Sequence, residues 1–269
     1  MIDENTAVIS GYRIRRLSNE TRSTVESDLA SGKYDGIGFN PHRGWVGDLK
    51  DFLGTGLKLR ALSLPFADKL GLDGALINCQ KELELLSLSD FTGKVHIESK
   101  CLKVLGLLVK PGITLGILPA LRTLNLTKAN EHTLQAASVG ARNLTTIYLN
   151  GGSIKSLSSL GDLSELQSVE LSNLRRLDGL SPLSNCPKLE ELTLYSVRTS
   201  QKLEAELARL KTLRVLRMAN CGVVDDLSFL DSLKLEDFRC LRTKITARDH
   251  NLLSRIKTVY LDKYQREGF

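Results

Sequence analysis

The residue types that form metal sites are widely separated in this sequence. Its four histidines fall in different segments: His42, His96, His132 and His250. None is three or four residues from another histidine, a cysteine or a paired acid on a shared face, which is the spacing that metal coordination requires. We therefore predict neither a metal site nor a bound cofactor.

Motifs for phosphate binding and for nucleophilic catalysis are absent as well. Gly54 and Gly56 precede a lysine, but no G-x-x-x-x-G-K-[ST] sequence follows, so a phosphate-binding loop is not predicted. Glu190 and Glu191 are adjacent, and adjacent side chains of a strand point to opposite sides, so they do not form a catalytic pair. No G-x-S-x-G segment occurs, which leaves no nucleophile elbow. We expect a protein that is not an enzyme.

The cysteines indicate a reducing compartment. Five are present, without a Cys-x-x-Cys pair: Cys79, Cys101, Cys186, Cys221 and Cys240. An odd, dispersed set argues against a disulfide framework or a zinc site and favours thiols that serve as small apolar residues. The acidic residues Asp3 and Glu4 stand where a signal peptide would be basic. No apolar run is long enough to span a membrane. We expect a soluble, cytoplasmic protein.

The composition indicates an internal repeat. Of the 269 residues, 52 are leucine, whereas aromatic residues make up 5%. The charged fraction of 25% and the hydrophobic fraction of 42% are those of a globular protein and exclude disorder. The net charge of +6 permits an acidic partner. Acidic and basic residues are interspersed, however, so a tail that binds nucleic acid is not indicated.

The phrase L-x-x-L-x-L recurs along almost the whole chain, for example as LRTLNL from Leu121 and LEELTL from Leu189. We number the phrase from one to six and continue the count into the following turn. The fourth positions are Ile37, Leu62, Leu86, Leu105, Leu124, Ile147, Val169, Leu192, Leu216, Phe238 and Val259. Their mean spacing is about 22 residues, within the range of leucine-rich repeats.

Each phrase predicts a short strand, because positions four and six are apolar while three and five vary. A strand this short cannot bury its apolar face alone, so we expect the strands to stack in parallel. Between strands, residues 154–163 and 177–183 carry leucine or isoleucine at every third position, which favours 3₁₀ turns. Residues 201–210 and 247–256 predict short helices, and the two shortest repeats leave no room for a full helix.

By these phrases the chain resembles the leucine-rich-repeat superfamily, with short, irregular, bacterial-type repeats. The resemblance implies an α/β repeat solenoid, a horseshoe with a parallel sheet on its concave face and 3₁₀ or short α segments on its convex face. We expect one structural domain, in which residues 1–33 cap a repeat domain of about eleven repeats at residues 34–269. The family's asparagine or cysteine at position nine is replaced in most repeats, for example by Phe91, Ala129, Gly152 and Val197. We therefore expect an irregular turn after the strand.

Function in this family is binding, and positions three, five and seven would face the concave side. In the first half, position five holds small residues: Gly38, Ser63, Ser87, Gly106 and Asn125. In the second half these positions hold tyrosines and charged residues: Tyr148, Glu170, Glu191, Thr193, Tyr195, Arg217, Asp237, Arg239, Tyr260 and Asp262. Tyrosine and arginine are enriched at interface hot spots. The alternative is that the charged members only form cross-strand ion pairs on a solvated sheet.

The hypothesis that follows is a monomeric, non-enzymatic module that binds a protein partner on its concave face. A sharper hypothesis is a cytoplasmic bacterial immunity or inhibitor protein that neutralises a toxin or effector. An adaptor or scaffold fits the same observations. Binding to nucleic acid or to an anionic surface is less favoured, because the sheet lacks the regular aromatic rows on which bases stack. No small-molecule substrate and no membrane contact are expected.

Overall fold

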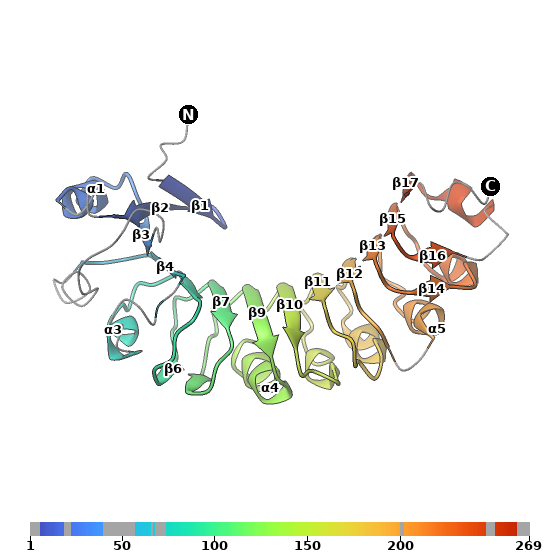
Figure 1. The fold of residues 1–269 in the computed structure, drawn as a ribbon, viewed down its shortest axis with the longest axis horizontal. Helices are drawn as coiled ribbons and strands as arrows, with labels where there is room; N and C mark the ends of the chain where they lie inside the picture. Colours follow the sequence, from blue (N-terminus) through green and yellow to red (C-terminus); the bar gives the residue numbers. More distant parts are fainter. Residues whose placement is uncertain are drawn as a thin grey trace. The chain divides into compact units, whose positions relative to one another are not determined.

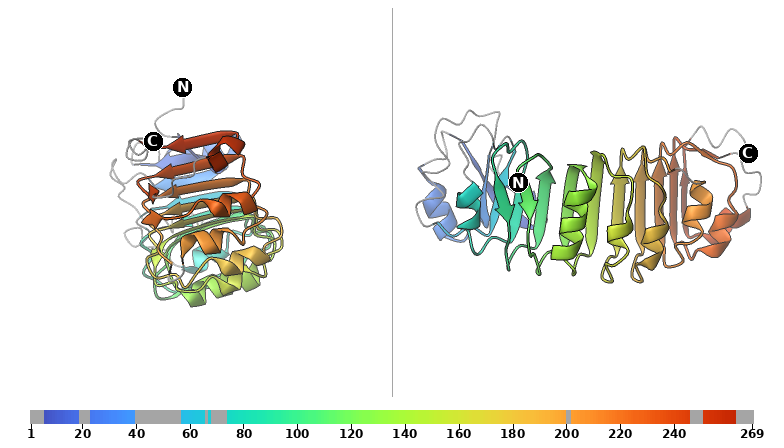
Figure 2. Two further views of the ribbon diagram at one scale, coloured as in Figure 1. Left: turned by 90° about the vertical axis from the view of Figure 1, so that its right-hand side faces the viewer. Right: turned by 90° about the horizontal axis from the view of Figure 1, so that it is seen from below.

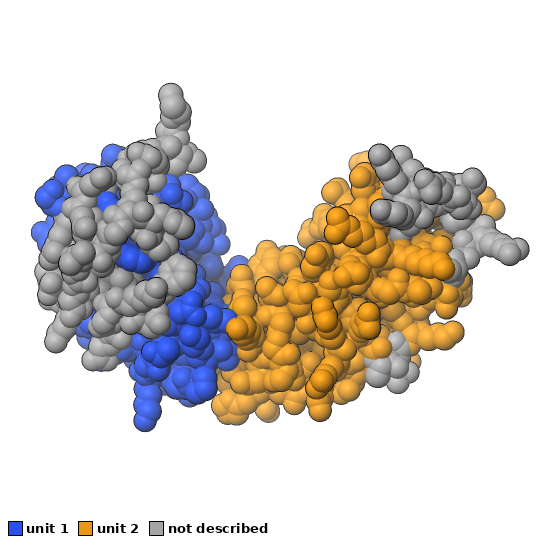
Figure 3. Space-filling view, viewed as in Figure 1, with its two compact units in different colours: residues 1–124 blue, residues 125–269 orange. Residues whose placement is uncertain are grey.

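The computed structural model describes residues 6–18, 23–39, 57–65, 67, 74–199, 202–245 and 251–262. It divides into two compact units, unit 1 with residues 1–124 and unit 2 with residues 125–269 (Figure 3). Both units consist of short strands that stack side by side, with connecting segments between them (Figure 1). The prediction of a single repeat domain at residues 34–269 with a separate cap at residues 1–33 remains a prediction.

Unit 1 begins with an antiparallel hairpin and continues as a parallel sheet. The strands of this sheet follow each other in the order β1 (Thr6–Ile9), β2 (Tyr12–Leu17), β3 (Gly36–Phe39), β4 (Ala61–Leu64), β5 (Leu85–Leu88) and β7 (Val104–Leu108). A second, two-stranded sheet pairs β6 (Val95–Ile97) with β8 (Ile113–Leu115). The helices are α1 (Val25–Ala30) and α3 (Gly74–Asn78). In the two shortest repeats the segments between the main strands contain β6 and β8, respectively, and no helix, as expected.

Unit 2 is a parallel sheet with helical segments on one side (Figure 2). Its strands are β9 (Thr123–Ala129), which contains the division between the units, β10 (Thr146–Gly152), β11 (Ser168–Ser172), β12 (Glu191–Tyr195), β13 (Val215–Ala219), β15 (Asp237–Leu241) and β17 (Thr258–Leu261). A small second sheet pairs β14 (Val223–Val224) with β16 (Lys244–Ile245). The α-helices are α4 (Glu131–Gly140) and α5 (Leu203–Leu207).

The connecting segments of unit 2 follow the expected pattern in most repeats. The 3₁₀ helices are η3 (Ser158–Leu160), η4 (Ser181–Asn185), η5 (Ser228–Ser232) and η6 (Asn251–Arg255). The predicted 3₁₀ turns and the helix at 201–210 are confirmed by η3, η4 and α5. The α-helix expected at 247–256 is wrong over its described part, where the chain forms the tighter η6. Among the described residues, no helix has the length and apolarity to cross a bilayer.

The strand register confirms the repeat phrase. In unit 1, Ile37, Leu62, Leu86 and Leu105 are direct partners on neighbouring strands. In unit 2 the same alignment joins the fourth positions Ile147, Val169, Leu192, Leu216, Phe238 and Val259. All of these residues except Val259 are 0–1% exposed and form the core, whereas Val259 on the last strand is 36% exposed.

Replacing Leu192 by alanine is expected to lower the free energy of unfolding by about 2–5 kcal/mol. Leu192 is completely buried, and its neighbours at the fourth positions on both sides are equally enclosed, so the cavity cannot collapse fully. Urea denaturation of the variant measures the change. A loss below about 1 kcal/mol would contradict the assigned core.

The turn after each strand is more regular than its sequence suggests. In seven repeats the residue at position eight adopts a left-handed backbone with φ between 46° and 63°: Asp90, Lys128, Gly151, Asn173, Ser196, Asn220 and Arg242. The amide of such a residue donates to the carbonyl at position seven of the next repeat, as from Asn173 to Tyr195 at 2.8 Å. The expected irregular turn is therefore wrong. Backbone hydrogen bonds at position eight organise the turn, so position nine does not need asparagine.

Candidate functional site

The histidines do not form a metal or catalytic site in the described part of the chain. His96 and His132 are exposed, whereas His42 and His250 lie outside the described residues. Within the described ranges, no group of three or more histidines, cysteines or acids could hold a metal ion. The His96 ring instead lies 2.9 Å from the Thr114 hydroxyl, which is a contact between two surface side chains of β6 and β8.

The cysteines divide into two groups. Cys186, Cys221 and Cys240 are buried, as expected for small apolar residues, but Cys79 and Cys101 are exposed. The interpretation of all five as apolar residues is therefore wrong for two of them. Burial raises the pKa of the Cys186 thiol to about 11, so this thiol stays protonated at neutral pH.

The recess of about 550 Å³ in unit 1 is the next candidate for chemistry. Its apolar floor includes Ile77, Leu86 and Ile97, and its margin includes His96 and Cys101. No hydrogen bond joins the Cys101 thiol to the His96 ring among the described contacts. The His96 ring therefore does not activate the Cys101 thiol through a direct hydrogen bond in this structure.

Position five forms a continuous row on the face of the unit 2 sheet that carries no helices. Tyr148, Glu170, Thr193, Arg217, Arg239 and Tyr260 are direct partners on successive parallel strands. This places six of the ten candidate residues side by side. The repeat register alone brings them together, because residues at one position of a parallel stack lie about 4.8 Å apart.

Charged members of this face are joined by ion pairs. The Arg217 guanidinium lies 3.8 Å from Glu191 and 3.5 Å from Asp237. Arg239 donates through Nε to both oxygens of Asp237 at 3.0 and 3.1 Å, which raises the pKa of this arginine. The ion pairs give the centre of the face a defined geometry, although each exposed pair contributes well under about 1 kcal/mol.

The tyrosines of the face remain accessible around this network. Tyr148, Tyr195 and Tyr260 are 37%, 46% and 50% exposed. Tyr148 is on β10 and Tyr260 on β17, so they lie on opposite sides of the ion pairs, and Tyr195 ends β12 between them. Such partly exposed aromatic rings combine apolar area with a hydroxyl group, which is the composition of binding hot spots.

Two candidates take other roles. The Asp262 carboxylate accepts a hydrogen bond from the Arg242 amide through Oδ2, and its Oδ1 is buried. The carboxylate thus takes the place that the carbonyl at position seven has in other repeats, for example at Tyr195 and Ala219. Glu170 accepts a bond from the Ser172 hydroxyl at 3.4 Å on its own strand and does not join the arginine network.

The corresponding face of unit 1 is covered by its own N-terminal hairpin. Ile14 of β2 is 1% exposed and packs with Ala61 and Leu85, which occupy position three of their strands. Ile9 and Tyr12 pack against the same cluster. The glycine at position five of β3 is thereby explained, because a side chain at Gly38 would meet Ile14 at 2.7 Å.

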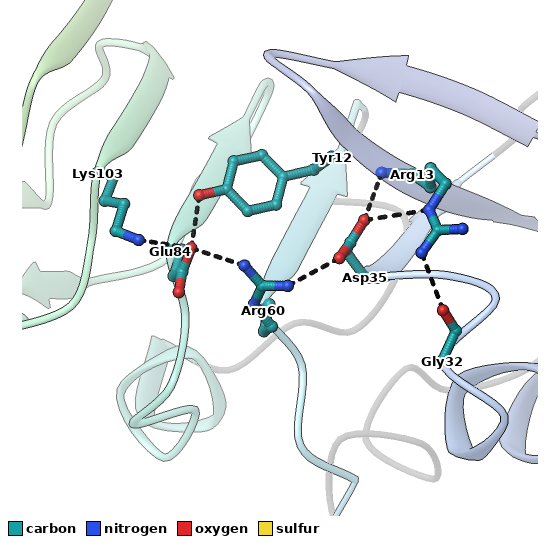
Figure 4. Close-up of polar contacts among 7 residues, drawn as sticks. All are labelled: Tyr12, Arg13, Gly32, Asp35, Arg60, Glu84 and Lys103. Carbon is teal, nitrogen blue, oxygen red and sulfur yellow. Dashed lines mark hydrogen bonds and ion pairs between the residues drawn. The ribbon is translucent and has the colours of Figure 1, made fainter.

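Tyr12 joins this hairpin to charged residues at the start of the strands (Figure 4). Its hydroxyl donates to Glu84 at 2.7 Å, across 72 residues of sequence, and its ring lies 5.7 Å from the Arg60 guanidinium. Glu84 also accepts from Arg60 at 3.1 Å and from Lys103 at 3.0 Å. The hydrogen bond from Tyr12, followed by those from Arg60 and Lys103, lowers the pKa of Glu84 to about 2. Burial and the bond to Glu84 raise the pKa of Tyr12 to about 12.

The stability of unit 1 is expected to fall at both pH extremes. Glu84 stabilises the fold fully above its ordinary pKa of 4.5, and this contribution is lost as the pH falls towards 2. Tyr12 contributes fully below its ordinary pKa of 10.0, and this contribution is lost as the pH rises towards 12. Urea denaturation of the wild type and of Tyr12→Phe, across the acidic and the alkaline pH range, measures the change in the free energy of unfolding. Parallel pH profiles for the two proteins would contradict the assignment.

The charged residues around Glu84 occupy position two of the phrase, which the repeat leaves variable. Their signs alternate over four successive repeats of unit 1, Asp35, Arg60, Glu84 and Lys103, and the alternation ends at Arg122, which follows Lys103 with the same sign. Arg60 lies 3.0 Å from Asp35 and 3.1 Å from Glu84. Unit 2 repeats the alternation in Glu190, Arg214 and Glu236, and Arg214 donates to Glu236. Alternating sign at one position of the repeat is the signal that could have revealed these ion pairs.

Comparison with known proteins defines the fold and goes no further. No protein-family model matches the sequence, and no curated protein matches it. The structure is similar to that of an internalin (inlF) from Listeria monocytogenes str. 4b F2365, with a TM-score of 0.60 and 17% identity over 88% of this chain and 70% of the internalin. Internalin C2 of the same organism is 23% identical over 71% of this chain and 84% of its own, with a TM-score of 0.49. TLR13, in a complex with ssRNA13, is 17% identical over 76% of this chain and 35% of its own, with a TM-score of 0.45.

The likeness to inlF and the register of the parallel strands together establish the class of protein. The chain has the leucine-rich-repeat fold, an α/β repeat solenoid in which one strand of each repeat joins a parallel sheet. The fold that the L-x-x-L-x-L phrase implied is confirmed.

Proposed function

We propose that this chain is a non-enzymatic module that binds a protein partner on the open sheet face of unit 2. One observation carries the proposal. Three exposed tyrosines, Tyr148, Tyr195 and Tyr260, stand around the ion-paired residues Arg217 and Arg239 on one face. The fold would be equally well served by serine or threonine at these positions, because none of these side chains packs into the core.

The contrast between the two units supports this choice of face. In unit 1 the equivalent positions are small and lie under the hairpin around Ile14. In unit 2 the described residues place no segment over the row from Tyr148 to Tyr260, and these two tyrosines are among the exposed large apolar residues. Large side chains therefore occur where the face is open, and small ones where the chain covers itself.

The finer proposal is a cytoplasmic bacterial immunity or inhibitor protein that neutralises a toxin or effector. An adaptor that binds several partners is the alternative. The ion-paired arginines and acids of the face support a protein partner over nucleic acid, because phosphate contacts need arginines and lysines that are free to replace counterions. Arg217 and Arg239 are already paired with Asp237.

Affinity capture from cells that express the protein, followed by mass spectrometry, tests the proposal. A single stoichiometric partner with toxic activity supports the immunity protein, and several unrelated partners support the adaptor. Capture should be repeated with Tyr148→Ser and Tyr260→Ser, which leave the core intact. A partner set that is unchanged by these variants contradicts the proposed face.

Arg217→Ala, Arg239→Ala and Tyr260→Ala are each expected to weaken partner binding by about 2 kcal/mol, roughly thirtyfold. Their side chains do not enter the core, so the free energy of unfolding should change by less than about 0.5 kcal/mol. Titration calorimetry and urea denaturation measure the two quantities. The matched control is Ser87→Ala in unit 1, which should leave affinity unchanged. If substitutions in α5 around Glu204 weaken partner binding and those on the sheet do not, the partner binds on the helical side.

A further inference from the structure

A cluster of arginines lies where β11 and β12 end. Arg175 and Arg176 follow β11, and Arg198 follows β12 in the next repeat. Backbone hydrogen bonds join the two segments directly: the Arg198 amide donates to Leu174 at 3.0 Å, and the Leu177 amide donates to Arg198 at 3.3 Å. All three arginines are exposed. Three positive charges are therefore held within two neighbouring repeats.

Packing keeps these side chains in solvent. Leu174 and Leu177 on either side of Arg175 and Arg176 are each 1% exposed. The two leucines anchor the segment in the core, so the arginines between them cannot enter it. The arrangement is rigid in its backbone, which lowers the entropy cost of positioning the guanidinium groups for a ligand.

The cluster has no internal counter-charge. Five of the seven other described arginines of unit 2 form ion pairs with acids: Arg209, Arg214, Arg217, Arg239 and Arg255. In the described part of the chain, no ion pair or side-chain hydrogen bond involves Arg175, Arg176 or Arg198. Asp178, the acid closest in sequence, pairs with none of them. Their guanidinium groups therefore keep hydrogen-bond donors for an anion.

The size and place of the cluster indicate the kind of anion. Neighbouring strands of a sheet are only about 5 Å apart, so the cluster can contact a few carboxylates. It is too small for the many phosphate contacts by which proteins bind nucleic acid. Tyr195 of the proposed face ends the same strand that leads to Arg198, and its carbonyl accepts the Asn173 amide at 2.8 Å. The cluster thus lies just beyond the carboxyl end of the strands, where Arg198 also borders a recess lined by Leu203 and Glu204 of α5.

We infer that Arg175, Arg176 and Arg198 bind an acidic segment of the protein partner, through guanidinium–carboxylate pairs at the margin of the unit 2 face. This inference rests on the proposed function, because it assigns a chemistry to the same partner. Arginine is suited to this role, since its planar group donates two parallel hydrogen bonds to one carboxylate.

The test uses a labelled oligoglutamate peptide as the probe, with oligoglutamine and a labelled single-stranded RNA as comparisons. The variant is Arg175→Glu/Arg176→Glu/Arg198→Glu in the full chain. A second variant, Arg175→Gln/Arg176→Gln/Arg198→Gln, removes the charges without reversing them, in case charge reversal impairs folding. The matched control, Lys188→Glu/Lys211→Glu/Lys234→Glu, changes three exposed lysines that precede strands of the same unit and has the same net charge.

Wild type is expected to bind oligoglutamate at least about tenfold more tightly than oligoglutamine, and the arginine variants should lose this preference. The lysine control should keep most of the preference for oligoglutamate. An equal loss in both triple variants would show attraction by net charge alone and overturn the inference. Tighter binding of RNA that is lost in the arginine variants would overturn the choice of an acidic protein segment.

The inference and the proposed function can fail separately. Oligoglutamate binding needs no partner and tests only the arginine cluster. Capture with the Tyr148→Ser and Tyr260→Ser variants tests only the face. Loss of peptide binding in the arginine variants together with unchanged capture by the tyrosine variants would overturn the face and leave the cluster standing.

Discussion

Replacing Gly36 by alanine is expected to destabilise unit 1 by about 3 kcal/mol or more. Gly36 of β3 is the direct partner of Ala61 on β4. A Cβ atom at Gly36 would stand 2.5 Å from the carbonyl carbon of Ala61 and 2.8 Å from its Cα. Both atoms belong to the backbone, so no side-chain rotation can relieve the overlap, and the two strands would have to separate.

Gly106→Ala is the matched control for this substitution. Gly106 also lies on the strand-only face of unit 1, but the nearest atom to an added Cβ is the Ser87 hydroxyl oxygen at 3.3 Å. That oxygen can rotate away, so a change below about 1 kcal/mol is expected. Urea denaturation of both variants gives the comparison. An equal loss in the free energy of unfolding for both variants would show that the contact between the β3 and β4 backbones is not unusually close.

Deleting residues 1–18 is expected to destabilise unit 1 by about 3–6 kcal/mol. Burial of one large aliphatic side chain such as Ile14 contributes about 1.5–3 kcal/mol. A hydrogen bond to a charged group, here from Tyr12 to Glu84, contributes a similar amount. The deletion also uncovers Leu85 and Ala61 on the sheet face, and exposed apolar patches promote aggregation.

Hydrogen exchange and size-exclusion chromatography measure the effect of the deletion. Protection should fall for amides of β3 to β5 and remain in β10 to β15, and the truncated chain should aggregate. Val8→Ser is the control, because Val8 of β1 is 53% exposed and contributes little to the cluster. A monomeric truncated chain of unchanged stability would also overturn the prediction that residues 1–33 form a cap.

The repeat made most of the fold predictable. An apolar residue at every fourth position of the phrase specifies the inner face of a strand, and the period specifies which residues become partners. For this reason Leu192 and Leu216 could be assigned to the core, and Glu170 and Thr193 to one row, before the structure was known. The exposure of Val259 on β17 departs from this pattern.

Features outside the period were not predictable in the same way. The hairpin precedes the repeats, so nothing in the spacing of the phrase indicates that Ile14 lies over Ala61 and Leu85. The small residues Gly38 and Ser63 were interpreted as a featureless surface, although they make room for the hairpin. The bond between Tyr12 and Glu84 joins residues far apart in sequence, and no local pattern encodes such a contact.

The placement of the candidate site was predicted, and the alternative interpretation anticipated cross-strand ion pairs, which Arg217 forms with Glu191 and Asp237. Position five placed Arg217 beside Arg239 correctly. That both would share Asp237 depends on side-chain geometry, which a repeat phrase does not specify. The arginines at 175, 176 and 198 were missed because they lie beyond position seven, where the analysis expected only an irregular turn.

The alternating charges at position two limit how this chain can change in length by duplication. In unit 1 the order is Asp35, Arg60, Glu84 and Lys103, so Arg60 and Glu84 each lie between two opposite charges. The alternation ends where Arg122 follows Lys103 with the same sign. Copying a single repeat would place two like charges on adjacent strands, where they repel. Copying two consecutive repeats would preserve the alternation. Gene duplications that lengthen this region without loss of stability should therefore add repeats in even numbers.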